Sequence, residues 1–170
     1  MSPPKPAYLF EQAERLIGGA EPQPSPRQED LRRAISTAYY GVFHFAVTAA
    51  ANMISVEEIR SSDHYSLVYR SIDHVWVRTL CEEIQKPTIR AKWQQFAPPG
   101  GFGLIADFAA AVSELQELRH EADYDPLFRI DAEEAKLVLK QARTAVDLFR
   151  ESSEAQQKAF LFLLLFKPRG

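Results

Sequence analysis

The chain has 170 residues, of which 46% are hydrophobic and 25% charged, and its formal net charge is −3. This length and composition predict a single globular domain, residues 1–170, with a substantial hydrophobic core. The slight acidity excludes a protein that coats nucleic acid through a general basic surplus, so any polynucleotide contact must use a local basic patch. The one cysteine, Cys81, lies among apolar helical positions, which predicts packing, and a lone thiol favours a cytoplasmic protein.

The N-terminal region is rich in proline, with six of the eleven prolines in the first 26 residues. Residues 18–26 have no apolar periodicity and are expected to form a loop. Apolar positions between Tyr8 and Ile17 predict a short helix before that loop, and the N-terminus lacks the pattern of a signal peptide.

Residues 26–54 are predicted to form a long helix at the centre of a bundle, because two adjacent lines of apolar side chains give it a wide apolar surface. Ser25 is expected to cap this helix, with Pro26 in its first turn. The two lines are Leu31, Ile35, Ala38, Val42, Phe45 and Ala49, and beside them Tyr39, Phe43, Ala46, Ala50 and Met53.

Two more helices follow in the middle of the chain. Residues 61–86 are predicted to form one helix, ended by a loop rich in proline and glycine that has room for a helical turn at 89–96. Residues 104–124 form the next helix, which ends there because Asp125 precedes Pro126 and a residue before proline disfavours the helical conformation.

The last part of the chain is also predicted to be helical. Asp131 with Glu134 three residues later has the pattern of a capping box, which opens a helix through Phe149. Residues 153–170 form a C-terminal apolar extension, whose run of seven apolar residues at 160–166 is far below the ~20 needed to cross a bilayer. We expect that run to continue as helix and to dock outside the bundle or across a dimer, with the first helix as a candidate neighbour.

These elements, without a convincing strand pattern, predict an all-α fold: an up-and-down four-helix bundle with additional terminal helices and no membrane span. One cysteine and four scattered histidines give no zinc spacing, and the glycine-rich segment 98–103 lacks the lysine and hydroxyl residue of a phosphate-binding loop. We therefore expect no metal and no cofactor, and no nucleophile has a recognisable base nearby.

Two stretches of the chain resemble HEPN domains. Residues 31–54 begin with a pair of arginines and continue into Ala-Tyr-Tyr at 38–40 and Phe-His at 43–44, as the second helix of those domains does. Residues 118–126, "LRHEADYDP", resemble the late-helix motif, in which an arginine precedes an Ala-Asp-Tyr triplet. The order, the separation and the predicted bundle also agree, so the resemblance spans roughly residues 8–150.

The resemblance implies a domain that commonly forms a homodimer. Many members are metal-independent ribonucleases, often toxins paired with a minimal nucleotidyltransferase antitoxin, and others are noncatalytic. In the nuclease members, an arginine and a histidine four to six residues later form the active centre at the dimer cleft. Arg119 matches that arginine, but Tyr124 stands five positions onward and no histidine follows His120.

Arg119 borders the apolar stripe of its helix, one turn beyond Leu115, so its charge needs a partner. One interpretation is an ion pair with Asp123 at a spacing of four residues. The other is a guanidinium fork aimed at a phosphate in a cleft.

The candidate catalytic residues are Arg119, His120 and Tyr124. Histidine suits the acid and base roles of metal-free RNA cleavage, whereas tyrosine, with a reference pKa of about 10, is a poor base. Tyr124 therefore fits a hydrogen bond to phosphate or stacking on a base. His120 is the substitute acid or base, although it points about 100° away from Arg119 on a regular helix.

A polar line on the central helix completes the site. Arg33, Thr37, Tyr40, His44 and Thr48 follow one another at spacings of three and four. We expect four residues to bind substrate in a cleft facing Arg119: Arg33, Tyr40, His44 and Asp123. The alternative is that Tyr40 and His44 are partly buried and form hydrogen bonds with polar neighbours. A modest basic stripe at Arg70, His74 and Arg78 is equally explained by a solvated face.

Two functions remain open from the sequence. The first is an RNA-interacting protein, catalytic or degenerate, within a toxin–antitoxin or stress-response system. The second is a noncatalytic helical module that binds a protein partner.

Overall fold

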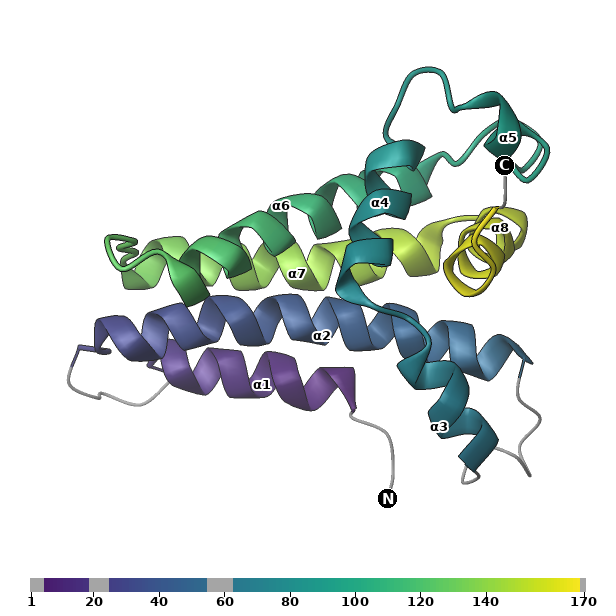
Figure 1. The fold of residues 1–170 in the computed structure, drawn as a ribbon. Coiled ribbons are helices and arrows are strands. Elements are labelled where there is room, and N and C mark those ends of the chain that lie inside the picture. The colour runs from purple at the N-terminus through teal and green to yellow at the C-terminus, as the bar shows by residue number, and fades with distance from the viewer. Residues whose placement is uncertain (1–4, 19–24, 55–62, 169–170) are drawn as a thin grey trace.

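The computed structural model describes residues 5–18, 25–54 and 63–168, and Figure 1 shows how they are arranged. These residues form eight α-helices and no strand, which confirms the all-α prediction. The helices are α1 (Pro6–Ile17), α2 (Gln28–Ile54), α3 (Asp63–Arg70), α4 (His74–Ile84), α5 (Ala91–Gln94), α6 (Leu104–Tyr124), α7 (Ala132–Glu151) and α8 (Glu154–Leu165). None of them is long and apolar enough to cross a membrane.

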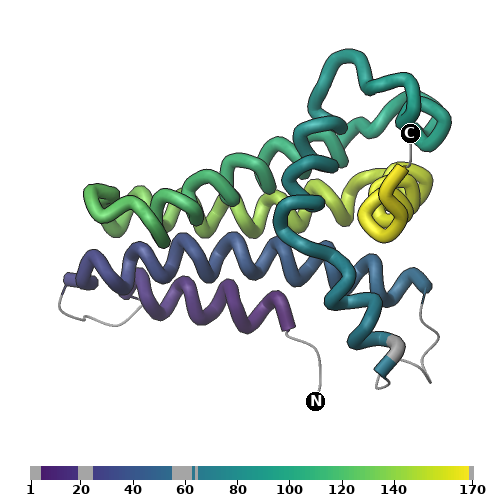
Figure 2. Tube along the Cα trace, viewed as in Figure 1, coloured from purple at the N-terminus to yellow at the C-terminus, as the bar shows by residue number. Residues whose placement is uncertain are grey.

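The body of the bundle consists of α1, α2, α6 and α7, which run alternately in opposite directions (Figures 1 and 2). The central helix α2 packs against the other three, as its wide apolar surface predicted. It begins at Gln28, so Arg27 precedes its first turn, and the prediction that Ser25 caps it is wrong. The short helix α1 takes the fourth place in the bundle, beside α2 and α7.

The predicted single helix at 61–86 is interrupted. Asp73 adopts an extended backbone, and its carboxylate accepts a hydrogen bond of 2.6 Å from the backbone N–H of Trp76. This cap starts α4 afresh at His74, because it satisfies a free amide of the first turn. As a result α4 crosses over α6 instead of lying along the bundle (Figure 1).

Three other predictions are confirmed, whereas the loop predicted at 18–26 lies mostly outside the described residues. The helical turn within 89–96 is α5, and α6 ends at Tyr124. The Asp131 carboxylate accepts from the Glu134 N–H at 2.8 Å, and the Glu134 carboxylate accepts from the Asp131 N–H at 2.9 Å. A second capping box at Ser153 makes α8 a separate helix after α7.

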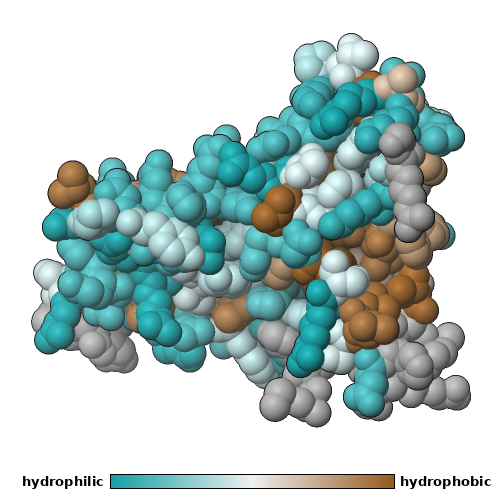
Figure 3. Space-filling view, in the orientation of Figure 1, coloured by the Kyte–Doolittle hydropathy of each residue, from teal (hydrophilic) through white to brown (hydrophobic). Residues whose placement is uncertain are grey.

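The C-terminal apolar run packs against one end of the bundle. Phe160 is fully buried, and its ring centroid lies 5.4 Å from that of Phe108 and 6.0 Å from that of Phe149. The Trp76 Nε1–H donates to the carbonyl oxygens of Leu163 and Leu164 at 3.2 and 3.0 Å. Docking on the bundle is thus confirmed. The helices that α8 packs against are α2, α4 and α6 and, through Phe149, α7, while α1 is not among its main neighbours. Apolar surface still gathers at this end of the molecule (Figure 3).

Glu83, a buried carboxylate on α4, holds the chain that follows that helix. It accepts hydrogen bonds from the Lys86 ammonium at 2.7 Å and from the backbone N–H and Nε of Arg90 at 2.8 and 2.6 Å. Burial alone would raise the pKa of this carboxyl, but those hydrogen bonds and the Arg90 charge lower it to about 2. Cys81, on the same helix, is fully buried, as predicted for a packing residue.

Candidate functional site

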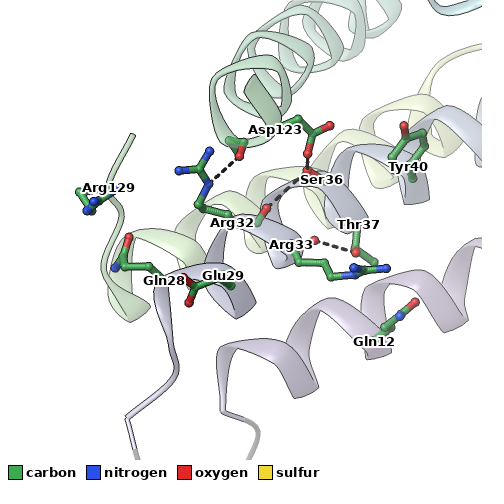
Figure 4. A pocket seen from close by; sticks show the side chains of 11 residues that line it. Gln12, Gln28, Glu29, Arg32, Arg33, Ser36, Thr37, Tyr40, Asp123 and Arg129 are labelled. Carbon is green, nitrogen blue, oxygen red and sulfur yellow. Dashed lines mark hydrogen bonds between the residues drawn. The ribbon is translucent and has the colours of Figure 1, made fainter. Parts of the chain in front are cut away.

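An open groove of about 830 Å³ runs between α1, the first half of α2 and the end of α6 (Figure 4). We call it the α2 groove. Its walls are mostly polar, with three guanidinium groups, two carboxylates and several hydroxyl and amide groups. The lining residues are Gln12, Gln28, Glu29, Arg32, Arg33, Ser36, Thr37, Tyr40, Ala122, Asp123 and Arg129.

Arg32 closes one end of the α2 groove by binding the turn after α6. Its Nε donates to the carbonyl of Ala122 at 2.7 Å, one terminal nitrogen donates to that of Asp125 at 2.8 Å, and the other to that of Phe128 at 3.4 Å. The positive charge faces the carbonyl end of the helix, where a cation is favourable. Arg32 therefore fixes both the turn after α6 and the last turn of that helix, which carries Asp123. The sequence did not reveal this role.

Arg33, the next residue, is exposed and forms no ion pair with any residue that the structure describes. Figure 4 shows its guanidinium extending along the groove toward Gln12 of α1. The hydroxyl of Thr37, one turn later, donates to the Arg33 carbonyl at 2.7 Å. The predicted polar line of α2 thus faces the α2 groove from Arg33 to Tyr40.

Arg119 stands behind this wall and is paired on two sides. One terminal nitrogen donates to the Tyr40 hydroxyl at 2.8 Å, and Nε lies 2.8 Å from a carboxylate oxygen of Asp123. The Nε contact is a close ion pair without an aligned hydrogen bond. The Ser36 hydroxyl donates to the other Asp123 oxygen. The predicted Arg119–Asp123 pair is therefore present, and Tyr40 joins it to the groove.

Two aromatic rings flank the guanidinium of Arg119. Its central carbon lies 5.4 Å from the ring centroid of Tyr40 and 5.7 Å from that of Tyr124, both within the range of a cation–π contact. The side chain is only 18% exposed. Burial lowers the pKa of Arg119, but the Tyr40 hydrogen bond and the Asp123 charge outweigh it and the net shift is upward, so the group stays cationic.

The two histidines behind Tyr40 are half-buried in an aromatic cluster. His44 Nδ1 is hydrogen-bonded to the Tyr69 hydroxyl, and His74 Nδ1 lies 2.8 Å from the Tyr39 hydroxyl. Burial raises the pKa of Tyr39, so its hydroxyl keeps its proton, and the tautomer of His74 sets which of the two groups donates. His44 does not line the α2 groove; it reaches the site only by stacking on Tyr40, with ring centroids 6.1 Å apart.

The position of His74 corrects one sequence interpretation. Arg70 and Arg78 are exposed, but His74 is turned inward, with its ring 3.9 Å from that of Phe43. The interruption before α4 leaves Arg70 on a separate helix, α3, while His74 is the first residue of α4 and packs against Phe43. The stripe of three basic residues is therefore not continuous.

His120 is exposed, and its ring centroid lies 5.0 Å from that of Tyr124. Neither side chain lines the α2 groove. His120, Arg119 and Arg78 line a smaller hollow of about 290 Å³ between α4 and α6. Arg119 thus separates the two hollows, with Tyr40 on one side and His120 on the other.

The inward histidines predict that the fold weakens in mild acid. Burial lowers the pKa of both His44 and His74, and the nearby Arg119 lowers that of His74 further, while Asp73 opposes the shift. A histidine whose folded pKa is depressed leaves stability unaffected above its unfolded value of about 6.5 and reduces it as pH falls through that value. The melting temperature should therefore drop between pH 7.5 and 5.

The variant His74→Asn tests this pH dependence, because an asparagine oxygen can accept the Tyr39 hydrogen bond without titrating. Its melting temperature should vary less over the same pH range, with His44 supplying the remainder. An unchanged pH profile in His74→Asn would contradict the assignment. Circular dichroism at constant ionic strength gives the measurement.

Among the residues that the structure describes, no three histidine, cysteine, aspartate or glutamate side chains come together in a way that could hold a metal ion. Comparison with family models, with curated proteins and with solved structures finds no match to this chain.

Proposed function

We propose that the α2 groove binds the phosphodiester backbone of RNA, and that the protein is an HEPN-like RNA-interacting protein whose site is suited to binding rather than cleavage. The observation that carries the proposal is Arg33, an exposed guanidinium without an ionic partner among the described residues. The Tyr40 hydroxyl lines the same groove, and it accepts a hydrogen bond from Arg119, which leaves its own proton to donate. Guanidinium and hydroxyl groups are the usual donors to phosphate oxygens.

The charge distribution in the groove supports an anionic ligand. Asp123 lines the groove, but Arg119 and Ser36 already hold its two oxygens. Arg33 and Arg129 are exposed there, against one further carboxylate, that of Glu29. The groove therefore keeps a local positive surplus although the whole chain carries −3.

The histidine positions favour binding over cleavage. Metal-free cleavage of RNA needs a base for the 2′-hydroxyl and an acid for the leaving oxygen. His44 and His74 are turned into the aromatic cluster and hydrogen-bonded to tyrosines. His120 is exposed but lies on the other side of Arg119 from the groove.

The variant Arg33→Ala tests the proposal. Its affinity for a single-stranded RNA oligonucleotide should fall roughly tenfold or more at low salt, since a charge-assisted hydrogen bond is lost. The slope of log affinity against log salt should decrease by about one. Fluorescence anisotropy with EDTA present gives both values, and the same samples on a denaturing gel report any cleavage.

Lys140→Ala is the matched control, because Lys140 is an exposed cation on α7 that does not line the α2 groove. It should bind as the unmodified protein does. Equal losses of RNA affinity in the two variants would show that the effect depends only on net charge. That result would refute the α2 groove as the binding site. Cleavage that disappears in Arg119→Ala would show a ribonuclease instead of a binding protein.

The proposed setting is a cytoplasmic toxin–antitoxin or stress-response system, with a nucleotidyltransferase-type antitoxin as partner and a homodimer as the functional unit. A noncatalytic protein-interaction module is the second candidate. It is favoured by large apolar side chains that stay exposed, such as Leu127 at 81% and Val75 at 74%. Their substitution by serine should disrupt a partner complex or a dimer while leaving RNA binding intact.

A further inference from the structure

Tyr124 is the outermost member of a row of aromatic and cationic groups. The row runs from the Tyr40 ring through the Arg119 guanidinium to the Tyr124 ring, and His120 touches Tyr124 on α6. Tyr124 is nevertheless 65% exposed, so most of its ring faces solvent. One face of the Tyr124 ring is enough to shield Arg119. The contact with Arg119 therefore does not explain why the other face of the ring is exposed to solvent.

We propose that Tyr124, with His120 beside it, is a stacking platform for an unpaired nucleobase of the RNA whose backbone lies in the α2 groove. The inference rests on the proposed function and narrows its ligand to single-stranded RNA. In a duplex, both faces of each base are covered by neighbouring bases, whereas an unpaired base offers a face to an aromatic side chain.

The distances place the platform within reach of a strand in the groove. Arg119 lies 5.4 Å from the Tyr40 centroid and 5.7 Å from the Tyr124 centroid, so the two centroids are at most about 11 Å apart. That span corresponds to about three nucleotides of stacked strand. Tyr40 lines the α2 groove, and so does Asp123, the residue before Tyr124.

The charges around Tyr124 favour a base there over a phosphate. Asp125 follows it in the chain, and Glu121 is exposed one turn earlier on α6. These carboxylates repel phosphate, whereas a neutral base can approach the ring. Phosphates accordingly stay over Arg33 and Arg129, and the base projects toward Tyr124.

The test compares Tyr124→Ala with Tyr8→Ala. Tyr8 is a matched control because it is also an exposed helical tyrosine, at 57%, with a cation, Lys5, 5.3 Å from its ring centroid. Tyr124→Ala should lose roughly 5- to 150-fold in affinity for single-stranded RNA, the range for one base–aromatic stack. Its salt dependence should not change, because no phosphate contact is removed. Tyr124→Phe should bind normally, and Tyr8→Ala as well.

Duplex RNA as a second ligand distinguishes a failure of the proposed function from a failure of the stacking platform. The unmodified protein should bind a duplex of the same sequence more weakly than the single strand, and Tyr124→Ala should reduce that difference. Absence of binding to either RNA would overturn the proposed function and the platform together. Binding that Arg33→Ala weakens but Tyr124→Ala leaves unchanged would overturn the platform alone, as would equal affinity for duplex and single strand.

Discussion

Truncation after Ala159 is expected to remove most of the stability of the fold. The deleted segment contains four buried side chains, with exposures between 0% and 7%, at Phe160, Leu161, Leu163 and Leu164. Burying each is worth about 1.5–3 kcal/mol, so together they contribute on the order of 6–12 kcal/mol. A domain of this size has a total stability of about 5–15 kcal/mol. The truncated chain should therefore be largely unfolded or melt far below the full-length protein.

Circular dichroism and tryptophan fluorescence measure this effect. The emission of Trp76 should shift to the red, because its indole loses the carbonyls of Leu163 and Leu164. A shorter truncation after Phe166 is the control. Among the described residues it removes the Lys167 contacts with Asp73 and the Trp76 ring, which are worth less than about 1 kcal/mol. Equal melting temperatures for the longer truncation and the full chain would contradict the expectation.

A pair of point variants tests whether α8 stabilises the fold through its buried side chains. Phe160→Ala removes a fully buried ring and should cost about 3–5 kcal/mol. Phe162→Ala, on the same helix but 51% exposed, should cost far less. The ratio of the two losses shows which face of α8 completes the core.

The helices could be predicted from the sequence because periodicity and capping are local. The capping box at Asp131 and the end of α6 before Pro126 each follow from a few neighbouring residues. The interruption before α4 shows the limit. Asp73 is a capping residue, but apolar positions such as Ile72 and Trp76 continue the helical spacing across it and are buried on either side.

The position of α8 could not be predicted for a different reason. A helix that is apolar on every side has no preferred face, so its pattern predicts burial without a direction. The deciding contacts are with Phe108 and Trp76, which lie far away in the sequence, and with Phe149 of the preceding helix. The prediction that α1 is a neighbour failed because α1 is already packed between α2 and α7.

The candidate site shows the same division between local and distant contacts. The Arg119–Asp123 ion pair follows from a spacing of four residues on one helix. The bond from Arg119 to Tyr40, and the clamp of Arg32 on the turn after α6, join residues about 80 to 90 positions apart. The local spacing placed Arg33 on the polar line of α2, but it gave no role to Arg32, which holds the turn after α6.

Gly41→Ala is expected to destabilise the protein, against the usual preference of helices for alanine. Within a helix this change ordinarily adds up to about 1 kcal/mol of stability. Here a Cβ on Gly41 would overlap Cε1 of Phe10 and lie 2.8 Å from its Cδ1, and this ring of α1 is only 8% exposed. Relieving such a contact in a packed core costs about 1–3 kcal/mol. This cost exceeds the gain that alanine brings through its higher helix propensity. Urea denaturation should show a lower midpoint.

The same substitution in a Phe10→Ala background identifies the cause. Phe10→Ala alone should cost about 3–5 kcal/mol, because it empties the space between α1 and α2. With the ring gone, the three closest contacts of a Cβ at position 41 are removed, and the alanine should now stabilise the chain by up to about 1 kcal/mol. The effect of Gly41→Ala therefore changes sign between the two backgrounds, a coupling expected only for residues in contact. If Gly41→Ala destabilises both backgrounds equally, the Phe10 ring is not what requires glycine at this position.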